Sequence, residues 1–243
     1  MAQFQMKIAG HVAAVHALFD STPQYCRAYL TQDPPDFSVT VRGEDLVFEQ
    51  AELDAEAAEE GFRRRLFTDP FLERAAIQRA FAEHLFDRDI LLTHGSCVAV
   101  DGYAYLFTAR SGTGKSTHTR LWREAFGPRA QMINDDKPFL HLTPNGVLAC
   151  GSPWSGKHGL DSNLALPLAG ICILERGSED RIRPMAAQDA LAMLRKQTYL
   201  PQGKEARFDA LVSALAEAVP LWHMECTKNI SAALVAHNAM SPK

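Results

Sequence analysis

The sequence predicts an α/β fold, and three observations support this prediction. Apolar runs of strand length alternate with segments whose apolar residues recur at helical spacing, so that strands and helices would share one core. A glycine-rich turn within "LFTARSGTGKSTHTRLW" connects an apolar run to a helix-like segment. The 243 residues contain no internal repeat, and 47% of them are hydrophobic and 22% charged, as is typical of globular proteins.

Charge and cysteine content exclude several classes of protein. The formal net charge of −4 argues against a general nucleic-acid-binding surface. The five cysteines are odd in number and none are spaced as C-x-x-C, which indicates reduced thiols rather than a disulfide scaffold or a zinc site. No apolar run reaches membrane-spanning length, and the first ten residues do not resemble a signal peptide. We therefore expect a cytoplasmic protein with neither a nucleic-acid nor a membrane partner.

Residues 1–68 predict a small N-terminal α+β segment that precedes a larger domain at residues 69–243. The stretch "FQMKIAGHVAAVHAL" predicts one or two strands, and "DPPDF" interrupts them. The stretch "FSVTVRGEDLVFEQ" predicts two short strands around a turn at Gly43. We expect this segment to bind an acceptor or to form a contact between copies in a homo-oligomer.

A helix and then a hairpin are predicted where the larger domain begins. The stretch "PFLERAAIQRAFAEHLF" has apolar residues at helical spacing after Asp69. In "SCVAVDGYAYLF", two apolar runs flank Asp101-Gly102, a strong signal for a two-residue hairpin turn. Paired positions would then sum to 203, so that Ser96 faces Phe107.

The same register places a histidine beside the glycine-rich turn. Extended by two residues, it puts His94 opposite Ala109, at the mouth of that turn. A histidine there can contact a phosphate or tune a neighbouring acid. A histidine next to Gly95 is also common as an ordinary turn residue, so both interpretations stay open.

The glycine loop, residues 109–115, has the features of a phosphate-binding turn. Gly112 and Gly114 allow positive φ angles and close approach of the backbone to an anion. A helix that starts at Lys115 would point its partially positive end at the same place. Ala109 stands where the motif G-x-x-x-x-G-K-[ST] has its first glycine, and the smallest side chain is tolerable there if its φ is negative. The predicted nucleotide-binding residues are Ser111, Gly112, Thr113, Gly114, Lys115, Ser116 and Thr117.

Two acids follow the next apolar strand. The stretch "AQMINDD" ends in Asp135-Asp136, and its strand would end at the same sheet edge as the strand before the glycine loop. One carboxylate can hold Mg²⁺, and the other can accept a proton from an attacking hydroxyl. Adjacent acids are also frequent in solvated turns.

A second glycine loop, residues 151–159, reads "GSPWSGKHG". It is expected to close over a transferring phosphoryl group, whose charge Lys157 would neutralise. Trp154 would pack against a ligand or against the core. Glu175-Arg176, at the end of the apolar strand "AGICILERG", is either a structural ion pair or a contact of the site. Two helices, a strand "LWHMEC" and a final helix complete the prediction.

Together, His94-Gly95, "SGTGKST" and Asp135-Asp136 resemble the catalytic domain of HPr kinase/phosphorylase and, more distantly, the phosphoenolpyruvate carboxykinases. The resemblance implies a P-loop core with a mixed sheet that uses ATP and Mg²⁺. It also implies that Asp135 is the general base and that Asp136 and Ser116 are metal ligands. His94 and Lys115 would then lie at the phosphates.

The expected activity is therefore a kinase reaction. It would transfer the γ-phosphoryl group of ATP to a hydroxyl of a small molecule, or to a serine of a peptide or protein. Three alternatives stay open: a regulatory ATPase with water as acceptor, a degenerate nucleotide-binding scaffold, and a carboxykinase-like lyase.

Overall fold

The computed structural model describes residues 1–59 and 61–242, and the chain forms two compact units, Met1–Leu85 and Phe86–Lys243. The sequence placed a boundary after residue 68. The division between the compact units instead falls between Leu85 and Phe86, at the end of helix α3 (Asp69–Phe86), so that most of this helix belongs to the N-terminal unit. Each unit is described by itself.

The N-terminal unit has the predicted α+β character. Strands β1 and β2 pair antiparallel, and β3 pairs parallel to β2. The unit consists of β1 (Ala2–Ile8), β2 (His11–Ala17), α1 (Ser21–Tyr25), β3 (Phe37–Thr40), α2 (Gly43–Glu59) and most of α3.

The prediction of a turn at Gly43 between two strands is wrong, because Gly43 begins helix α2. Glu44 and Asp45 lie in the first turn of that helix, where negative charge is favourable. The carboxylate of Asp45 also accepts a hydrogen bond from the backbone N–H of Arg42, at 2.8 Å. This stabilisation of the helix N-terminus, together with the helix-favouring residues that follow, outweighs the strand-like alternation of apolar and polar residues.

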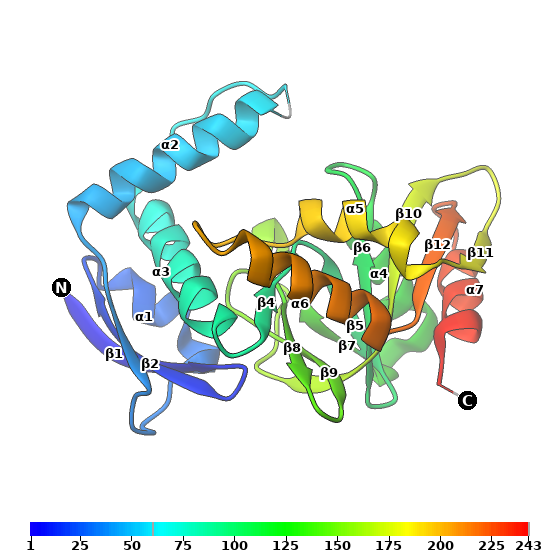
Figure 1. Ribbon diagram of the computed structural model, residues 1–243, viewed down its shortest axis with the longest axis horizontal. Coiled ribbons are helices and arrows are strands. Elements are labelled where there is room, and N and C mark those ends of the chain that lie inside the picture. Colours follow the sequence, from blue (N-terminus) through cyan, green and yellow to red (C-terminus); the bar gives the residue numbers. More distant parts are fainter. Residues whose placement is uncertain (60, 243) are drawn as a thin grey trace. The chain divides into compact units, whose positions relative to one another are not determined.

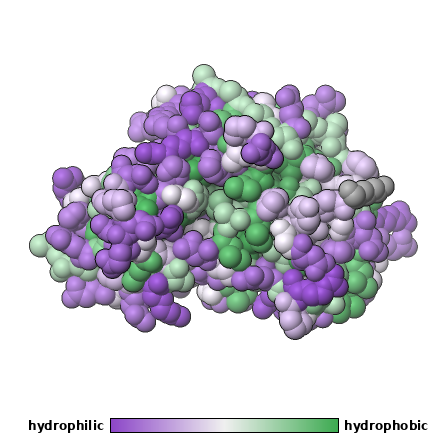
Figure 2. All heavy atoms as spheres, turned by 90° about the horizontal axis from the view of Figure 1, so that it is seen from below, coloured by the Kyte–Doolittle hydropathy of each residue, from purple (hydrophilic) through white to green (hydrophobic). Residues whose placement is uncertain are grey.

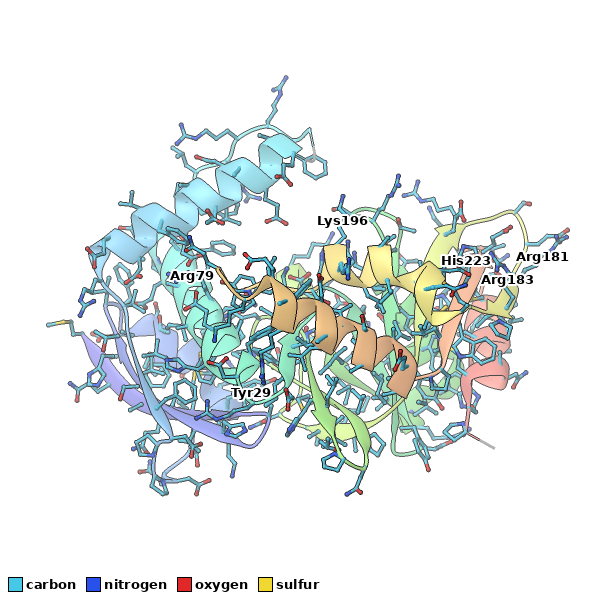
Figure 3. The ribbon with its side chains drawn as sticks, in the orientation of Figure 1. Tyr29, Arg79, Arg181, Arg183, Lys196 and His223 are labelled. Atoms are coloured by element: carbon cyan, nitrogen blue, oxygen red, sulfur yellow. The ribbon has the colours of Figure 1, made fainter. Side chains whose placement is uncertain are left out.

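Helix α3 belongs to the N-terminal unit because its side chains are anchored there. The buried carboxylate of Glu73 accepts hydrogen bonds from the backbone N–H groups of Leu18 and Phe19 and from the hydroxyl of Thr22. Arg79, labelled in Figure 3, forms ion pairs with carboxylates of both α2 and α3, among them Glu49 at 2.6 Å. These polar contacts connect α3 to α1, to the segment between β2 and α1, and to α2.

The second unit is a mixed α/β structure, as predicted. Its nine-stranded sheet has the order β4-β8-β9-β10-β6-β5-β7, with β12 beside β10 and β11 beside β12. The strands are β4 (Ile90–Leu92), β5 (Ser96–Val100), β6 (Tyr103–Thr108), β7 (Ala130–Asn134), β8 (Phe139–Thr143), β9 (Gly146–Cys150), β10 (Ala165–Arg176), β11 (Arg181–Pro184) and β12 (Leu221–Cys226). The helices are α4 (Lys115–Phe126), α5 (Ala187–Gln197), α6 (Glu205–Ala218) and α7 (Ser231–Met240).

Strand β10 curls the sheet by changing partners along its length. Residues 165–167 pair antiparallel with β9, and the register shifts between Leu168 and Gly170. From Leu168 onward β10 runs parallel to β6, and from Ile171 onward it also runs parallel to β12. A Cβ on Gly170 would lie 3.0 Å from the carbonyl oxygen of Pro220, so the absence of a side chain allows the close approach.

Helices cover the two faces of this sheet (Figure 1). Helices α5 and α6 pack with Leu106 and Ile171 into one core. Helices α4 and α7 pack with Phe107 and Cys172 into the other. Successive residues of β6 and β10 thus enter opposite cores, which explains why these strands are apolar without interruption.

The predicted hairpin is confirmed in register. Ser96 pairs with Phe107, and Asp101 and Gly102 have φ angles of 52° and 85°, as a two-residue turn of this kind requires. Strand β5 also pairs antiparallel with β7, so it lies between β6 and β7. Strands β6 and β7 therefore run in the same direction and end at the same edge, although they are not neighbours.

We predict that Gly151→Ala severely destabilises the second unit. A Cβ there would lie 1.9 Å from the carbonyl oxygen of Ser162 and 2.9 Å from that of Ile133, and neither backbone group can yield cheaply. The free energy of unfolding should fall by about 3 kcal/mol or more, at the upper end of overpacking costs. Chemical denaturation measures this loss. Gly146→Ala is the control: its φ of 118° adds backbone strain that Gly151 does not carry, but its Cβ would meet nothing within 4 Å. Equal losses in the two variants would refute the steric explanation.

Among the described residues, none of the helices combines the length and the apolar character that a bilayer crossing requires. Figure 2 shows hydrophilic side chains spread over one face of the molecule, with smaller apolar areas between them.

Candidate active site

A cavity of about 520 Å³ lies where β6 and β7 end and helix α4 begins. Most of the residues singled out in the sequence line it together, although they come from four separate segments. The lining residues are His94, Ser111, Gly112, Gly114, Lys115, Ser116, Thr117, Arg120, Asp135, Asp136, Lys157 and His158. Thr113, the remaining predicted nucleotide-binding residue, lies within the glycine loop between two of them.

The glycine loop has the predicted backbone conformation. Gly112 and Gly114 have φ angles of 72° and 124°, and α4 begins at Lys115. Ala109 is fully buried with a negative φ, which is why an alanine is tolerated where the motif has glycine. The ammonium of Lys115 donates to the carbonyl oxygen of Ala109 at 3.2 Å, a contact that it can exchange for a phosphate.

Backbone contacts fix His94 at the mouth of this loop. Its N–H donates to the carbonyl oxygen of Gln197 at 2.6 Å, and its own carbonyl accepts from the hydroxyl of Thr108 at 2.9 Å. Its Nε2 lies 3.3 Å from Oδ1 of Asp136. Burial lowers the pKa of His94 despite this carboxylate, so the imidazole is neutral near pH 7 and donates its Nε2–H.

Asp136 is held as a carboxylate. Burial alone raises its pKa, but the hydrogen bond from His94 and the nearby charges of Lys137 and Lys115 outweigh burial, and the pKa lies below its ordinary value. The backbone carbonyl of Asp136 accepts from the N–H of Gly95 at 3.0 Å, which ties the acid pair to the His94 segment. The ionised form is the one that can bind a cation.

Asp135 is buried, with 6% of its surface exposed, and two residues that the sequence argument missed hold it. The hydroxyl of Ser96 donates to Oδ1 of Asp135 at 2.6 Å and lies 2.7 Å from the hydroxyl of Thr119 on α4. The carboxylate is thereby connected to the first turns of the helix that carries Lys115. The hairpin register predicts that Ser96 faces Phe107. The side-chain partners of Ser96 lie 23 and 39 residues away along the chain, and no local pattern predicts them.

Asn134 is a third residue of the site that carries no sequence motif. Its fully buried side chain accepts from the backbone N–H groups of Asp136 and Lys137, at 2.7 and 2.6 Å. Its amide also donates to the carbonyl oxygen of Ser152, at 2.7 Å. One side chain thus shapes the turn that carries the acid pair and joins it to the second glycine loop.

The second glycine loop approaches Asp136 closely. Gly156 has a φ of 65°, and a Cβ there would lie 3.2 Å from Cβ of Asp136. Lys157 and His158 follow in a short 3₁₀ turn and line the cavity. Trp154 is 6% exposed with its ring near Phe139, so it packs in the core.

We predict that Gly156→Ala displaces the carboxylate of Asp136 from His94 and so raises the pKa of Asp136, because the hydrogen bond from His94 lowers that pKa. Gly159→Ala is a matched control: its φ of 58° brings similar backbone strain, but its Cβ would meet nothing within 4 Å. The carboxyl ¹³C chemical shift of Asp136, followed against pH in both variants, measures the difference. Equal pKa shifts would mean that strain in the loop, and not contact with Asp136, causes the effect.

The oxygen atoms around the cavity suit a cation that is bound partly by the protein and partly by a substrate. Among the described residues, no group of three or more His, Cys, Asp or Glu side chains is arranged to hold a metal ion. Mg²⁺ commonly binds through one or two protein oxygens, with phosphate oxygens and waters as the remaining ligands. The hydroxyl of Ser116 and the carboxylate of Asp136, which line the same cavity, fit that pattern.

No known family model matches the chain, and no curated protein matches it. Among solved structures, the fold is distantly similar to that of the Hpr(Ser) kinase/phosphatase from Coxiella burnetii, with a TM-score of 0.38 and 11% sequence identity. The similarity covers 61% of this chain and 95% of that one. A likeness at this level concerns the coarse arrangement of a mixed α/β sheet and carries no statement about chemistry.

Proposed function

We propose that the unit Phe86–Lys243 is a P-loop phosphotransferase core of the HPr kinase type. It would transfer the γ-phosphoryl group of ATP to a hydroxyl of a small molecule, or to a serine of a peptide or protein. One observation carries the proposal: the glycine loop, the acid pair, His94 and Lys157 line a single cavity. The N-terminal unit would contribute acceptor recognition or a contact between copies of the chain.

The cavity suits a triphosphate. Backbone N–H groups at the start of α4 and the partial positive charge of its N-terminus favour an anion. A Cβ on Gly112 would meet nothing within 4 Å, so the loop has open space beside it. Lys115 would bind the β- and γ-phosphates, and Ser116 and Asp136 would hold Mg²⁺. The metal would supply neutralisation of the charge on the phosphate oxygens.

Asp135 would take the proton of the attacking hydroxyl. The hydrogen bond from Ser96 fixes Oδ1, so that Oδ2 is the oxygen that would receive this proton. A buried and positioned carboxylate needs little reorganisation when the acceptor binds. This supports Asp135, rather than the cation-binding Asp136, as the base.

Lys157 and His94 would assist the transfer of the phosphoryl group in different ways. Lys157 would place a positive charge against the equatorial oxygens of the transferring phosphoryl group. The neutral imidazole of His94 donates to Asp136 and so would orient the metal-binding carboxylate.

The test is phosphate transfer from γ-labelled ATP in the presence of Mg²⁺, with a panel of hydroxyl metabolites and serine peptides. Label in an acceptor with wild-type protein, and its loss with Lys115→Ala, would support the proposal. Fast ATP hydrolysis without any acceptor would favour a regulatory ATPase instead. Phosphoenolpyruvate formed from oxaloacetate would favour a lyase. Failure to bind MgATP would overturn the proposal.

A further inference from the structure

Arg176 contacts the glycine loop from outside the cavity. It is the last residue of β10, and its guanidinium donates to the carbonyl oxygen of Gly112 at 2.6 Å and to that of Thr113 at 3.3 Å. The preceding Glu175 instead lies 3.2 Å from His223. Of the two possibilities that the sequence left open, the geometry therefore favours a contact of Arg176 with the site.

The backbone that carries Arg176 is firmly placed. Arg176 pairs with Cys226 of β12, and the N–H of Gly177 donates to the carbonyl oxygen of Cys226 at 3.1 Å. A Cβ on Gly177 would lie 2.9 Å from Cβ of Glu225, so the chain turns tightly against β12. The glycine loop is thus bonded to the rim of the sheet and not only to its own helix.

Peptide geometry gives this contact a consequence for anion binding. In a trans peptide the C=O and the following N–H point in opposite directions, and none of the described peptide bonds is cis. Since the carbonyl of Thr113 points to Arg176, the N–H of Gly114 points away from Arg176, and Gly114 itself lines the cavity. The N–H of Thr113 donates to the carbonyl oxygen of Arg110 at 3.2 Å, which holds the neighbouring peptide.

We propose that Arg176 is a positioning residue that fixes the glycine loop in its anion-binding conformation before ligand arrives. Its planar fork bonds two successive carbonyls at once, which the point charge of a lysine cannot reproduce. The part of this inference that concerns nucleotide binding rests on the proposed function. The part that concerns the conformation of the loop is independent of it.

The expected effect of Arg176→Ala on affinity follows from the fraction of molecules whose loop is in the anion-binding, or competent, conformation. Apparent affinity falls in proportion to the fraction of molecules whose loop is competent. If the loop without Arg176 is competent about one-tenth of the time, the Kd for a bound triphosphate rises about tenfold. Turnover at saturating nucleotide should change much less, because bound ligand restores the loop.

The first experiment uses no ligand. Backbone ¹⁵N relaxation of the full-length protein should give order parameters for Gly112 and Gly114 near 0.85 in the wild type and below about 0.6 in Arg176→Ala. Arg176→Lys should be intermediate. Arg183→Ala is the matched control, since Arg183 lies on the next-but-one strand beside His223 (Figure 3). Unchanged order parameters in folded Arg176→Ala would overturn the proposal.

The second experiment titrates each variant with MgATP and with magnesium tripolyphosphate by calorimetry. If Arg176 positions the loop, Arg176→Ala raises the Kd for both ligands by the same factor of about ten, while Arg183→Ala changes neither Kd. A loss confined to ATP would mean that Arg176 contacts the nucleoside, and this would overturn the proposal, as would no loss at all. If wild-type protein binds neither ligand, the proposed function fails, and the order parameters still decide whether Arg176 holds the loop.

Discussion

Asp135→Asn should lower turnover at saturating MgATP by about 100-fold or more, the usual contribution of a general base. The amide has nearly the shape of the carboxylate and can still accept a hydrogen bond from Ser96, but it cannot take the proton of an attacking hydroxyl. The Kd for MgATP should stay within about threefold of the wild-type value, because the nucleotide would be held by other residues. Single-turnover kinetics with labelled ATP and calorimetry measure the two quantities separately.

Glu179→Gln is the control for this experiment, since Glu179 is an exposed carboxylate paired with Arg181. It removes the same charge from the second unit without touching the cavity. Near-normal turnover in Asp135→Asn would show that Asp135 is not the base. A loss of both turnover and MgATP affinity would instead assign it to nucleotide binding.

Lys115→Ala should weaken MgATP binding at least tenfold, and transfer should fall with it. Charge-assisted hydrogen bonds of this kind are worth about 1.5–3 kcal/mol each, and about 1.4 kcal/mol corresponds to a factor of ten. The fold should tolerate the change, because Lys115 is the first residue of α4 and its side chain lines the cavity rather than a hydrophobic core. Calorimetry with MgATP and a thermal melt together separate binding from stability.

Lys196→Ala provides the matched control, because Lys196 is an exposed residue of α5 (Figure 3) and is not among the residues that line the cavity. The affinity of the Lys196→Ala variant for MgATP should equal that of the wild-type protein. If Lys115→Ala binds MgATP as tightly as Lys196→Ala does, the glycine loop does not hold the phosphates.

The local parts of the site could be predicted from the sequence. The hairpin around Asp101 and Gly102, the start of α4 at Lys115 and the positive φ angles in the glycine loop all follow from turn and capping rules that act over a few residues. The common edge of β6 and β7 was predicted correctly. The insertion of β5 between them was not, because the pairing of β5 with β7 is a long-range contact that no local pattern specifies.

Long-range contacts account for what the sequence could not reveal. Ser96, Thr119 and Asn134 carry no motif, and their importance depends on side chains that meet only in the folded chain. The error at Gly43 has a different cause: the flanking apolar residues fit strand alternation, while the acids after Gly43 favour a helix N-terminus. Helix α3 was assigned to the larger domain because nothing local shows that Glu73 is bonded to the N-terminal unit.

The most direct test of the central claim is a crystal structure of the protein with Mg²⁺ and a non-hydrolysable ATP analogue. The proposed function predicts that the β- and γ-phosphates lie within hydrogen-bond distance of the Lys115 ammonium and of the N–H groups that begin α4. It also predicts the metal between the hydroxyl of Ser116 and the carboxylate of Asp136. A nucleotide seated elsewhere, or triphosphate in the cavity with the metal away from both side chains, would contradict it.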